Sequence, residues 1–265
     1  MLNFAKLVRL VLVSGSILFS AVCAIAQGMP KLLIVLADPP SSAPVTQMTA
    51  SGKFSTVDTF DVRSATPTLA QLLAYDVILA YTDYIPANPS GLGDVLADAV
   101  DAGRLVTVAT YGLSLPWAIT GRIQTAAYSP LVIGTTGAVS GSLIAVVPTD
   151  PIFTGIALGS VTYSHNGNFA HATLASGATL LATDGAGINM IARSSSGRVI
   201  GLNLWPTTMD GANNSEFFKL LANIVANNFT PAAPASIPTL SEWGMIILSG
   251  LMVLGTFVVL RRRQM

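Results

Sequence analysis

The chain has 265 residues, of which 51% are hydrophobic and 10% charged, and its mean hydropathy is +0.62. This composition excludes a disordered chain, allows one sizeable core, and is more apolar than that of an ordinary soluble enzyme. We therefore expect part of the chain to contact lipid. Thirteen basic residues balance thirteen acidic ones, which leaves no basic stripe for nucleic acid, so we expect no nucleic-acid partner.

Residues 1–26 have the pattern of a secretory signal peptide. Lys6 and Arg9 make the start positive, and the uncharged apolar stretch 10–22 that follows is too short to span a membrane comfortably. Residues 24–26 (Ala-Ile-Ala) then provide a small-x-small cleavage site. We expect the secretion machinery and a signal peptidase as partners, with an uncleaved N-terminal anchor as the alternative.

The single cysteine, Cys23, lies within this segment. Lipidation of Cys23 is a further alternative, although Ser20 and Val22 depart from the usual lipobox pattern. Cleavage after Ala26 would leave a mature chain without cysteine, which excludes disulfides, thiol catalysis and thiolate metal sites.

The C-terminal region combines a Pro/Ala-rich linker at 231–236, a short polar motif, an apolar stretch and a basic cluster. The apolar stretch 245–260 would rise about 24 Å as a helix, a little less than the ~30 Å hydrocarbon core of a bilayer. Trp243 and the three arginines 261–263 can occupy the two interfaces. We expect one transmembrane helix over 244–260, with the arginines cytoplasmic and the preceding domain outside.

The order of these features resembles the IPTL-CTERM protein-sorting domain. The matching residues are Ile237, Pro238, Thr239, Leu240, Trp243, Gly244, Arg261, Arg262 and Arg263. The resemblance covers 237–265 and implies an exported protein of a Gram-negative bacterium, recognised by an exosortase, a transpeptidase-like membrane enzyme. It places the protein in the inner membrane with its domain in the periplasm, and onward delivery to the cell surface is a further step. An ordinary tail anchor is the alternative.

Residues 30–229 alternate β-rich and helix-like stretches, the pattern of a layered α/β domain that we place at 27–230. The stretch 31–37 is continuously apolar, as in a strand buried on both faces, whereas 56–62 alternates and is expected nearer an edge. Further strands are expected at 77–82, 104–110, 179–183, 188–193 and 198–204, and helices at 68–74, 90–102 and 215–227.

The stretch 123–149 contains no charged residue before Asp150. Pro130, Gly134, Gly137 and Gly141 divide it into pieces too short to cross a membrane. We therefore expect two buried or hairpin strands here and no second transmembrane segment.

Two short motifs in the domain resemble those of class I glutamine amidotransferases. Residues 108–112 (Val-Ala-Thr-Tyr-Gly) are similar to the strand and tight turn that expose the catalytic cysteine, with Thr110 at the cysteine position. Residues 201–207 are similar to the segment carrying the catalytic histidine and glutamate, with Trp205 and Thr207 at those positions. The resemblance implies a flavodoxin-like, amidotransferase-like layered sheet with flanking helices, in which the catalytic residues are not retained.

These replacements remove the chemistry of the family. A threonine hydroxyl needs a strong adjacent base, the indole of Trp205 cannot accept a proton, and no sulfur remains to form a thioester. We therefore expect no amidotransferase activity. A hydroxyl nucleophile at Thr110 is the functional alternative to a strand-end threonine that bonds its own turn.

The two histidines, His165 and His171, lie six residues apart in a Gly/Asn-containing stretch that we expect to be a loop. This is no recognised metal spacing, and no carboxylate follows before Asp184. A pair of histidines can bind zinc or assist acid–base chemistry, but solvent-facing loop residues are the simpler interpretation. We expect no metal and no cofactor, because the sequence also lacks a phosphate loop and a dinucleotide fingerprint.

Polar residues follow the first and third expected strands, where open α/β sheets bind their ligands. We take Asp38, Asp83, Tyr84 and Tyr111 as candidate ligand contacts, with strand-end capping and turn formation as the alternative for the aspartates.

The sequence thus predicts an exported, envelope-targeted protein whose α/β domain is a non-catalytic ligand-binding or structural domain. The sorting tail implies a polysaccharide-associated envelope, and with it a surface polysaccharide as a partner. The alternative is an envelope hydrolase that uses Thr110, or a His165/His171 site, on saccharides or peptides. A structural partner domain that self-associates is the third interpretation.

Overall fold

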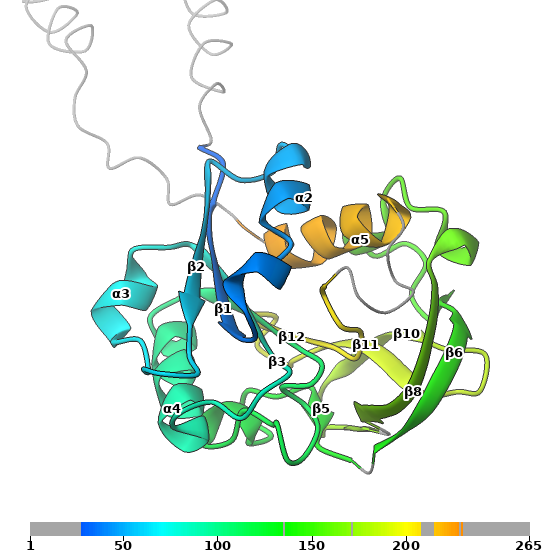
Figure 1. Ribbon diagram of the computed structural model, residues 1–265. Coiled ribbons are helices and arrows are strands. Elements are labelled where there is room, and N and C mark those ends of the chain that lie inside the picture. The colour runs from blue at the N-terminus through cyan, green and yellow to red at the C-terminus, as the bar shows by residue number, and fades with distance from the viewer. Residues whose placement is uncertain (1–27, 135, 171, 208–214, 228, 230–265) are drawn as a thin grey trace, which may run out of the picture. The chain divides into compact units, whose positions relative to one another are not determined.

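The computed structural model describes residues 28–134, 136–170, 172–207, 215–227 and 229, with backbone alone at 136, 138–140 and 164–170 (Figure 1). The expected signal peptide 1–26, the linker 231–236 and the sorting segment 237–265 lie outside the described residues. Within the described part of the chain, no helix combines the length and the apolar character needed to cross a membrane.

A mixed sheet of eight strands forms the centre of the domain, in the order β2-β1-β3-β4-β12-β11-β10-β7. The strands are β1 Lys31–Ala37, β2 Thr56–Asp61, β3 Val77–Thr82, β4 Leu105–Ala109, β7 Ile144–Ala145, β10 Thr179–Thr183, β11 Asn189–Arg193 and β12 Val199–Leu202. Pairing is parallel from β2 through β12 and antiparallel from β12 to β7. Five carboxyl ends therefore meet at one edge of the sheet.

Helices cover both faces of the sheet, which gives three layers (Figure 1). Leu32, Ile34 and Leu36 of β1 pack on one face with α2 (Val45–Ala50) and α5 (Ser215–Ala226). The residues between them, such as Leu33 and Val35, pack on the other face with α3 (Leu69–Leu73) and α4 (Pro89–Asp101). Alternate side chains of a strand point to opposite faces, so a strand covered on both sides must be apolar throughout.

The two helices on the second face begin at side chains that cap them. Thr68 accepts a hydrogen bond from the backbone N–H of Gln71, whose side chain accepts one from the backbone of Thr68, which makes a capping box before α3. Asn88 accepts from the N–H of Gly91 at the start of α4. Gly103, with φ of +93°, follows α4 in the left-handed region that terminates helices.

The predicted strands and helices of the sheet are confirmed, within the usual uncertainty at their ends. The expectation for 123–149 is wrong in its pairing. This stretch contains β5 (Leu131–Val132), β6 (Thr136–Ser142) and β7, none of which pairs with another of the three. Their partners come later in the chain, so local sequence could not show them: β5 pairs with β9 (Thr173–Leu174), β6 with β8 (Thr162–Ala170) and β7 with β10.

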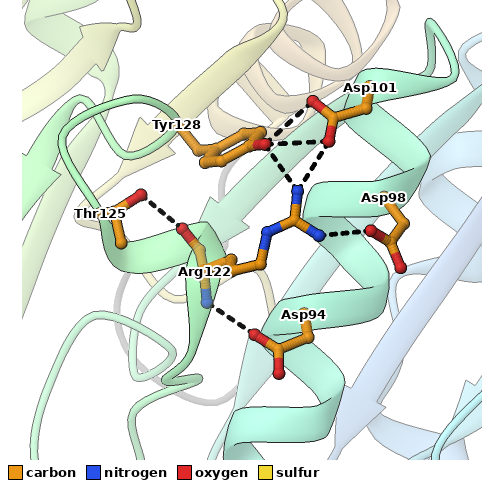
Figure 2. A network of polar contacts seen from close by, with 6 residues as sticks. All are labelled: Asp94, Asp98, Asp101, Arg122, Thr125 and Tyr128. Atoms are coloured by element: carbon orange, nitrogen blue, oxygen red, sulfur yellow. Dashed lines mark hydrogen bonds and ion pairs between the residues drawn. The ribbon is translucent and has the colours of Figure 1, made fainter.

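The loop after β4 is fixed to α4 by close backbone contact and by a polar network. A β-carbon on Gly93 would lie 1.6 Å from the carbonyl oxygen of Thr120, so only glycine allows the loop to approach this closely. In Figure 2, the Arg122 guanidinium binds Asp98 and Asp101 of the same helix. Tyr128 joins the network, because its hydroxyl lies 2.8 Å from Arg122 and 2.9 Å from Asp101.

Candidate functional site

The candidate site lies at the carboxyl edge of the sheet, where four adjacent strands end side by side. Asp38 follows β1, Asp83 follows β3, Thr110 follows β4 and Asn203 follows β12. The chain leaves β1 toward β2 on one side and returns to β3 on the other, so the order of strands reverses between β1 and β3. Open α/β sheets bind ligands at such a switch point.

Thr110 occupies the end of β4, but its hydroxyl already has a partner. The side chain is fully buried, and its Oγ1 donates a 3.0 Å hydrogen bond to Oδ1 of Asn203. The Nδ2 of Asn203 donates in turn to the carbonyl oxygen of Asn189, at 3.2 Å. An amide oxygen accepts a hydrogen bond but does not take up a proton at neutral pH, so this pair lacks the base that a hydroxyl nucleophile needs.

Two tryptophan rings pack against Tyr111, the residue that follows Thr110. The ring of Tyr111 lies 5.5 Å from that of Trp117 and 5.6 Å from that of Trp205, both tilted, within the range of favourable aromatic packing. Tyr111 and Trp205 are buried. The indole Nε1 of Trp205 is also buried and has no hydrogen-bond partner among the described residues, so the position that resembles the catalytic histidine holds a packed ring.

Asp38 is a buried carboxylate at the switch point. It is 3% exposed, and it accepts a 2.6 Å hydrogen bond from the hydroxyl of Ser42. Burial raises the pKa of Asp38, the Ser42 hydrogen bond lowers it, and the nearby charge of Asp83 raises it again, so that the net shift is upward. Asp38 and Asp83 are thus brought close enough to repel each other.

A second group lies at the end of β2, the edge strand. The guanidinium of Arg63 bonds both carboxylate oxygens of Asp61, and its Nη2 lies 2.6 Å from Oδ2. The same guanidinium lies 5.7 Å from the centre of the Tyr84 ring, a cation–π distance. Tyr84 is 50% exposed, so it offers an aromatic face to solvent beside the carboxylates.

The structure places five of the predicted residues at one edge of the sheet. Asp38, Asp83, Tyr84, Thr110 and Tyr111 all follow strands whose carboxyl ends share one edge. The backbone connects two of these strand ends directly, since the N–H of Tyr111 donates to the carbonyl oxygen of Thr82, at 2.8 Å.

The expectation of a loop around the histidines is wrong for His165. Its backbone belongs to β8 and pairs with Val139 of β6. The Gly and Asn residues that suggested a loop therefore lie within a paired strand. His171 lies outside the described residues. Among the described residues, no three His, Cys, Asp or Glu side chains form a group that could hold a metal ion.

Three residues of this edge are not among the predicted site residues: Ser42, Trp117 and Asn203. Asn203 carried a usable signal, because a polar residue at the end of an apolar strand must find a hydrogen-bond partner when buried. Ser42 and Trp117 lie in connecting segments. The pattern of apolar residues there does not indicate where a side chain lies relative to the sheet.

Comparisons with known proteins concern the tail and the domain separately. Residues 235–264 match the IPTL-CTERM motif, which confirms the predicted resemblance and implies recognition by an exosortase-like enzyme. No curated protein matches the chain.

Solved structures match the fold of the domain. A protein described as ThuA-like from Bacteroides uniformis ATCC 8492 has a TM-score of 0.51 at 11% identity, over 75% of this chain and 91% of that chain. A GMP synthase component from Thermoplasma acidophilum has a TM-score of 0.48 at 11% identity, over 76% and 96%. A glutamine amidotransferase from Thermotoga maritima has a TM-score of 0.45 at 11% identity, over 65% and 74%. At such identity the first match shows the fold alone.

Proposed function

We propose that this chain is an exported protein whose tail is handled by an exosortase-like enzyme. Signal peptide 1–26 would direct export, and the helix over 244–260 would hold the tail in the inner membrane with the domain 27–230 in the periplasm. The match of residues 235–264 to the IPTL-CTERM motif supports this route. Three arginines directly after the apolar stretch support the orientation, because such residues stay cytoplasmic.

The domain delivered by this tail is proposed to be non-catalytic. The observation that carries this proposal is the bond between Thr110 and Asn203, which joins the hydroxyl at the nucleophile position to an amide oxygen. Trp205 at the histidine position packs against Tyr111 and offers no proton acceptor. Both features leave the shape of the fold intact and remove its nucleophile and base.

Without that chemistry, the carboxyl edge is proposed to bind a ligand. The partly exposed carboxylate of Asp83 would supply hydrogen-bond acceptors there, with the buried Asp38 behind it, and the half-exposed ring of Tyr84 offers a flat apolar face. Tyr111 supports the edge from within, because it is buried against Trp117. Acceptors beside an aromatic face suit a hydroxyl-rich ligand, and a surface polysaccharide in the envelope is the proposed partner.

The sorting step is tested by fractionating cells that contain or lack the exosortase-like enzyme. We expect the full-length chain to stay in the inner membrane without the enzyme, and a shorter or relocated form to appear with it. Alanine at Ile237, Pro238 and Leu240 should give the enzyme-free pattern in both strains, whereas Pro231→Ala in the linker should not. Full-length protein in the inner membrane of both strains would count against sorting.

A further inference from the structure

A cavity of about 240 Å³ lies away from the carboxyl edge, between α2, α5 and the segment that joins the short helices η3 (Pro151–Phe153) and η4 (Leu158–Ser160). Its lining residues are Ser51, Lys53, Thr154, Gly155, Ile156, Lys219, Ala222 and Asn223. Lys53 and Ser51 follow α2, and Figure 1 shows α2 beside α5, which carries the last three of these residues. The cavity is smaller than a typical drug-sized pocket.

Side-chain hydrogen bonds to the backbone fix the walls of this cavity. The Nδ2 of Asn223 donates to the carbonyl oxygens of Ile152, at 2.9 Å, and Thr154, at 3.1 Å. Glu216 accepts from the N–H of Ala157, at 2.9 Å, which holds the following segment to the first turn of α5. On the other wall, the Ser51 hydroxyl donates to the carbonyl oxygen of Met48, at 2.6 Å. The cavity is therefore organised before any ligand binds, which lowers the entropic cost of binding.

Charge distinguishes this cavity from the rest of the domain. Two lysines, Lys53 and Lys219, are among its lining residues, and none of those residues is acidic. Lys219 forms an ion pair with Glu216, outside the lining. Lys53, like Lys31, Arg104 and Arg198, makes no ion pair with any residue that the structure describes. The positive charge of Lys53 is therefore available to a ligand.

We propose that this cavity is a binding site for an oxyanion, a carboxylate or a phosphate, carried by a group no larger than a monosaccharide. Lys53 and Lys219 would contact the anion from opposite walls through charge-assisted hydrogen bonds. The side-chain oxygen of Asn223, whose nitrogen is occupied, would accept from a hydroxyl of the same group. The site is distinct from the carboxyl edge and does not depend on it.

Titration calorimetry on the full chain in neutral detergent tests this site. The probes are inorganic phosphate and glucuronate, with glucose as the uncharged control, at low and at high salt. We expect at least one anion to bind and glucose not to bind. Lys53→Gln and Lys219→Gln should each weaken binding about tenfold, and 1 M salt should weaken it further, because exposed charges are screened.

Lys31→Gln is the matched control, because it removes the same charge from an exposed lysine outside the cavity. It should leave the affinity unchanged. Binding of phosphate alone would indicate a phosphorylated ligand, whereas binding of glucuronate alone would indicate an acidic sugar. Either result supports the site. Failure of both anions to bind, or equal weakening by Lys31→Gln, would overturn the proposal, and weakening by Arg63→Gln alone would place the anion at the carboxyl edge instead.

Discussion

Thr110 and Asn203 bind each other across the carboxyl ends of two neighbouring strands, with Oγ1 of the threonine 3.0 Å from Oδ1 of the asparagine. The strands β4 and β12 are parallel neighbours, and Ala109 is in register with Leu202, so the two side chains leave the sheet one residue later at the same level. The hydroxyl at the position of a nucleophile is thus part of the internal hydrogen bonding of the fold.

Thr110→Val should destabilise the domain. Valine has nearly the same shape but no hydroxyl, so it leaves Oδ1 of Asn203 buried without this donor, at a cost of about 1–3 kcal/mol. Urea unfolding of the full chain, followed by tryptophan fluorescence, measures the difference. Thr110→Ser keeps the donor and should lose less, and a valine variant as stable as the parent would show that the bond contributes nothing.

Gly93→Ala should also destabilise the domain, although alanine is the better helix former. The added β-carbon would meet the carbonyl oxygen of Thr120 at 1.6 Å, so the loop after β4 has to move, at a cost of about 1–3 kcal/mol. Ser90→Ala in the same helix should change stability by less than about 0.5 kcal/mol. Equal unfolding midpoints for Gly93→Ala and the parent would mean that the loop is not held against α4.

Arg122→Met should give a small loss of stability that depends on salt. The guanidinium connects Asp98, Asp101 and Tyr128 at the surface of α4 (Figure 2), and exposed ion pairs are weak and screened by ions. Thermal unfolding in low salt and in 1 M NaCl should show a difference from the parent that shrinks at high salt. A loss that is unaffected by salt would assign the role of Arg122 to packing instead.

Asp150→Asn should reduce stability at neutral pH by about 3–5 kcal/mol, because it breaks a buried ion pair and leaves Arg193 without its partner. Burial opposes ionisation of Asp150, but two hydrogen bonds from Arg193, of 2.6 and 2.9 Å, leave its pKa below the ordinary 3.8. The unfolded chain binds the proton more readily, so the parent loses this contribution as the pH falls below 3.8. Urea midpoints from pH 7 to pH 2.5 should therefore converge for parent and variant at the acid end, and a constant difference would refute the assignment.

Asp38→Asn should have the opposite sign. Burial, with the charge of Asp83, raises the pKa of Asp38 in the folded state, so ionisation of this group opposes folding once the pH exceeds the raised value. The variant should be more stable than the parent at pH 7 and should lose that advantage below pH 3.8, where both forms are neutral. Lower stability of the variant at pH 7 would mean that the carboxylate is better stabilised than its surroundings suggest.

The central sheet could be predicted because its strands carry local signals. The run 31–37 is apolar at every position since both faces of β1 are covered, and the alternation in 56–62 reflects β2 at the edge. The tail motif was equally readable, because its residues are contiguous and their order is specific.

The remaining features depend on contacts between distant residues. The strand β8 contains Gly and Asn residues typical of turns, so the local sequence predicts a loop at His165, whereas pairing with β6 makes this segment a strand. The partner of Thr110 lies 93 residues away. The sequence predicted which strand ends form the candidate site, but not which side chains there bind each other.

Hydrolytic turnover tests the central proposal most directly. The full chain, purified in detergent, would be incubated with ester, amide and glycoside substrates beside the variants Thr110→Ala, His165→Ala and His171→Ala. We expect the parent to show no turnover above that of the three variants with any of these substrates. A hydrolysis that the parent performs and that one of the three substitutions abolishes would contradict it.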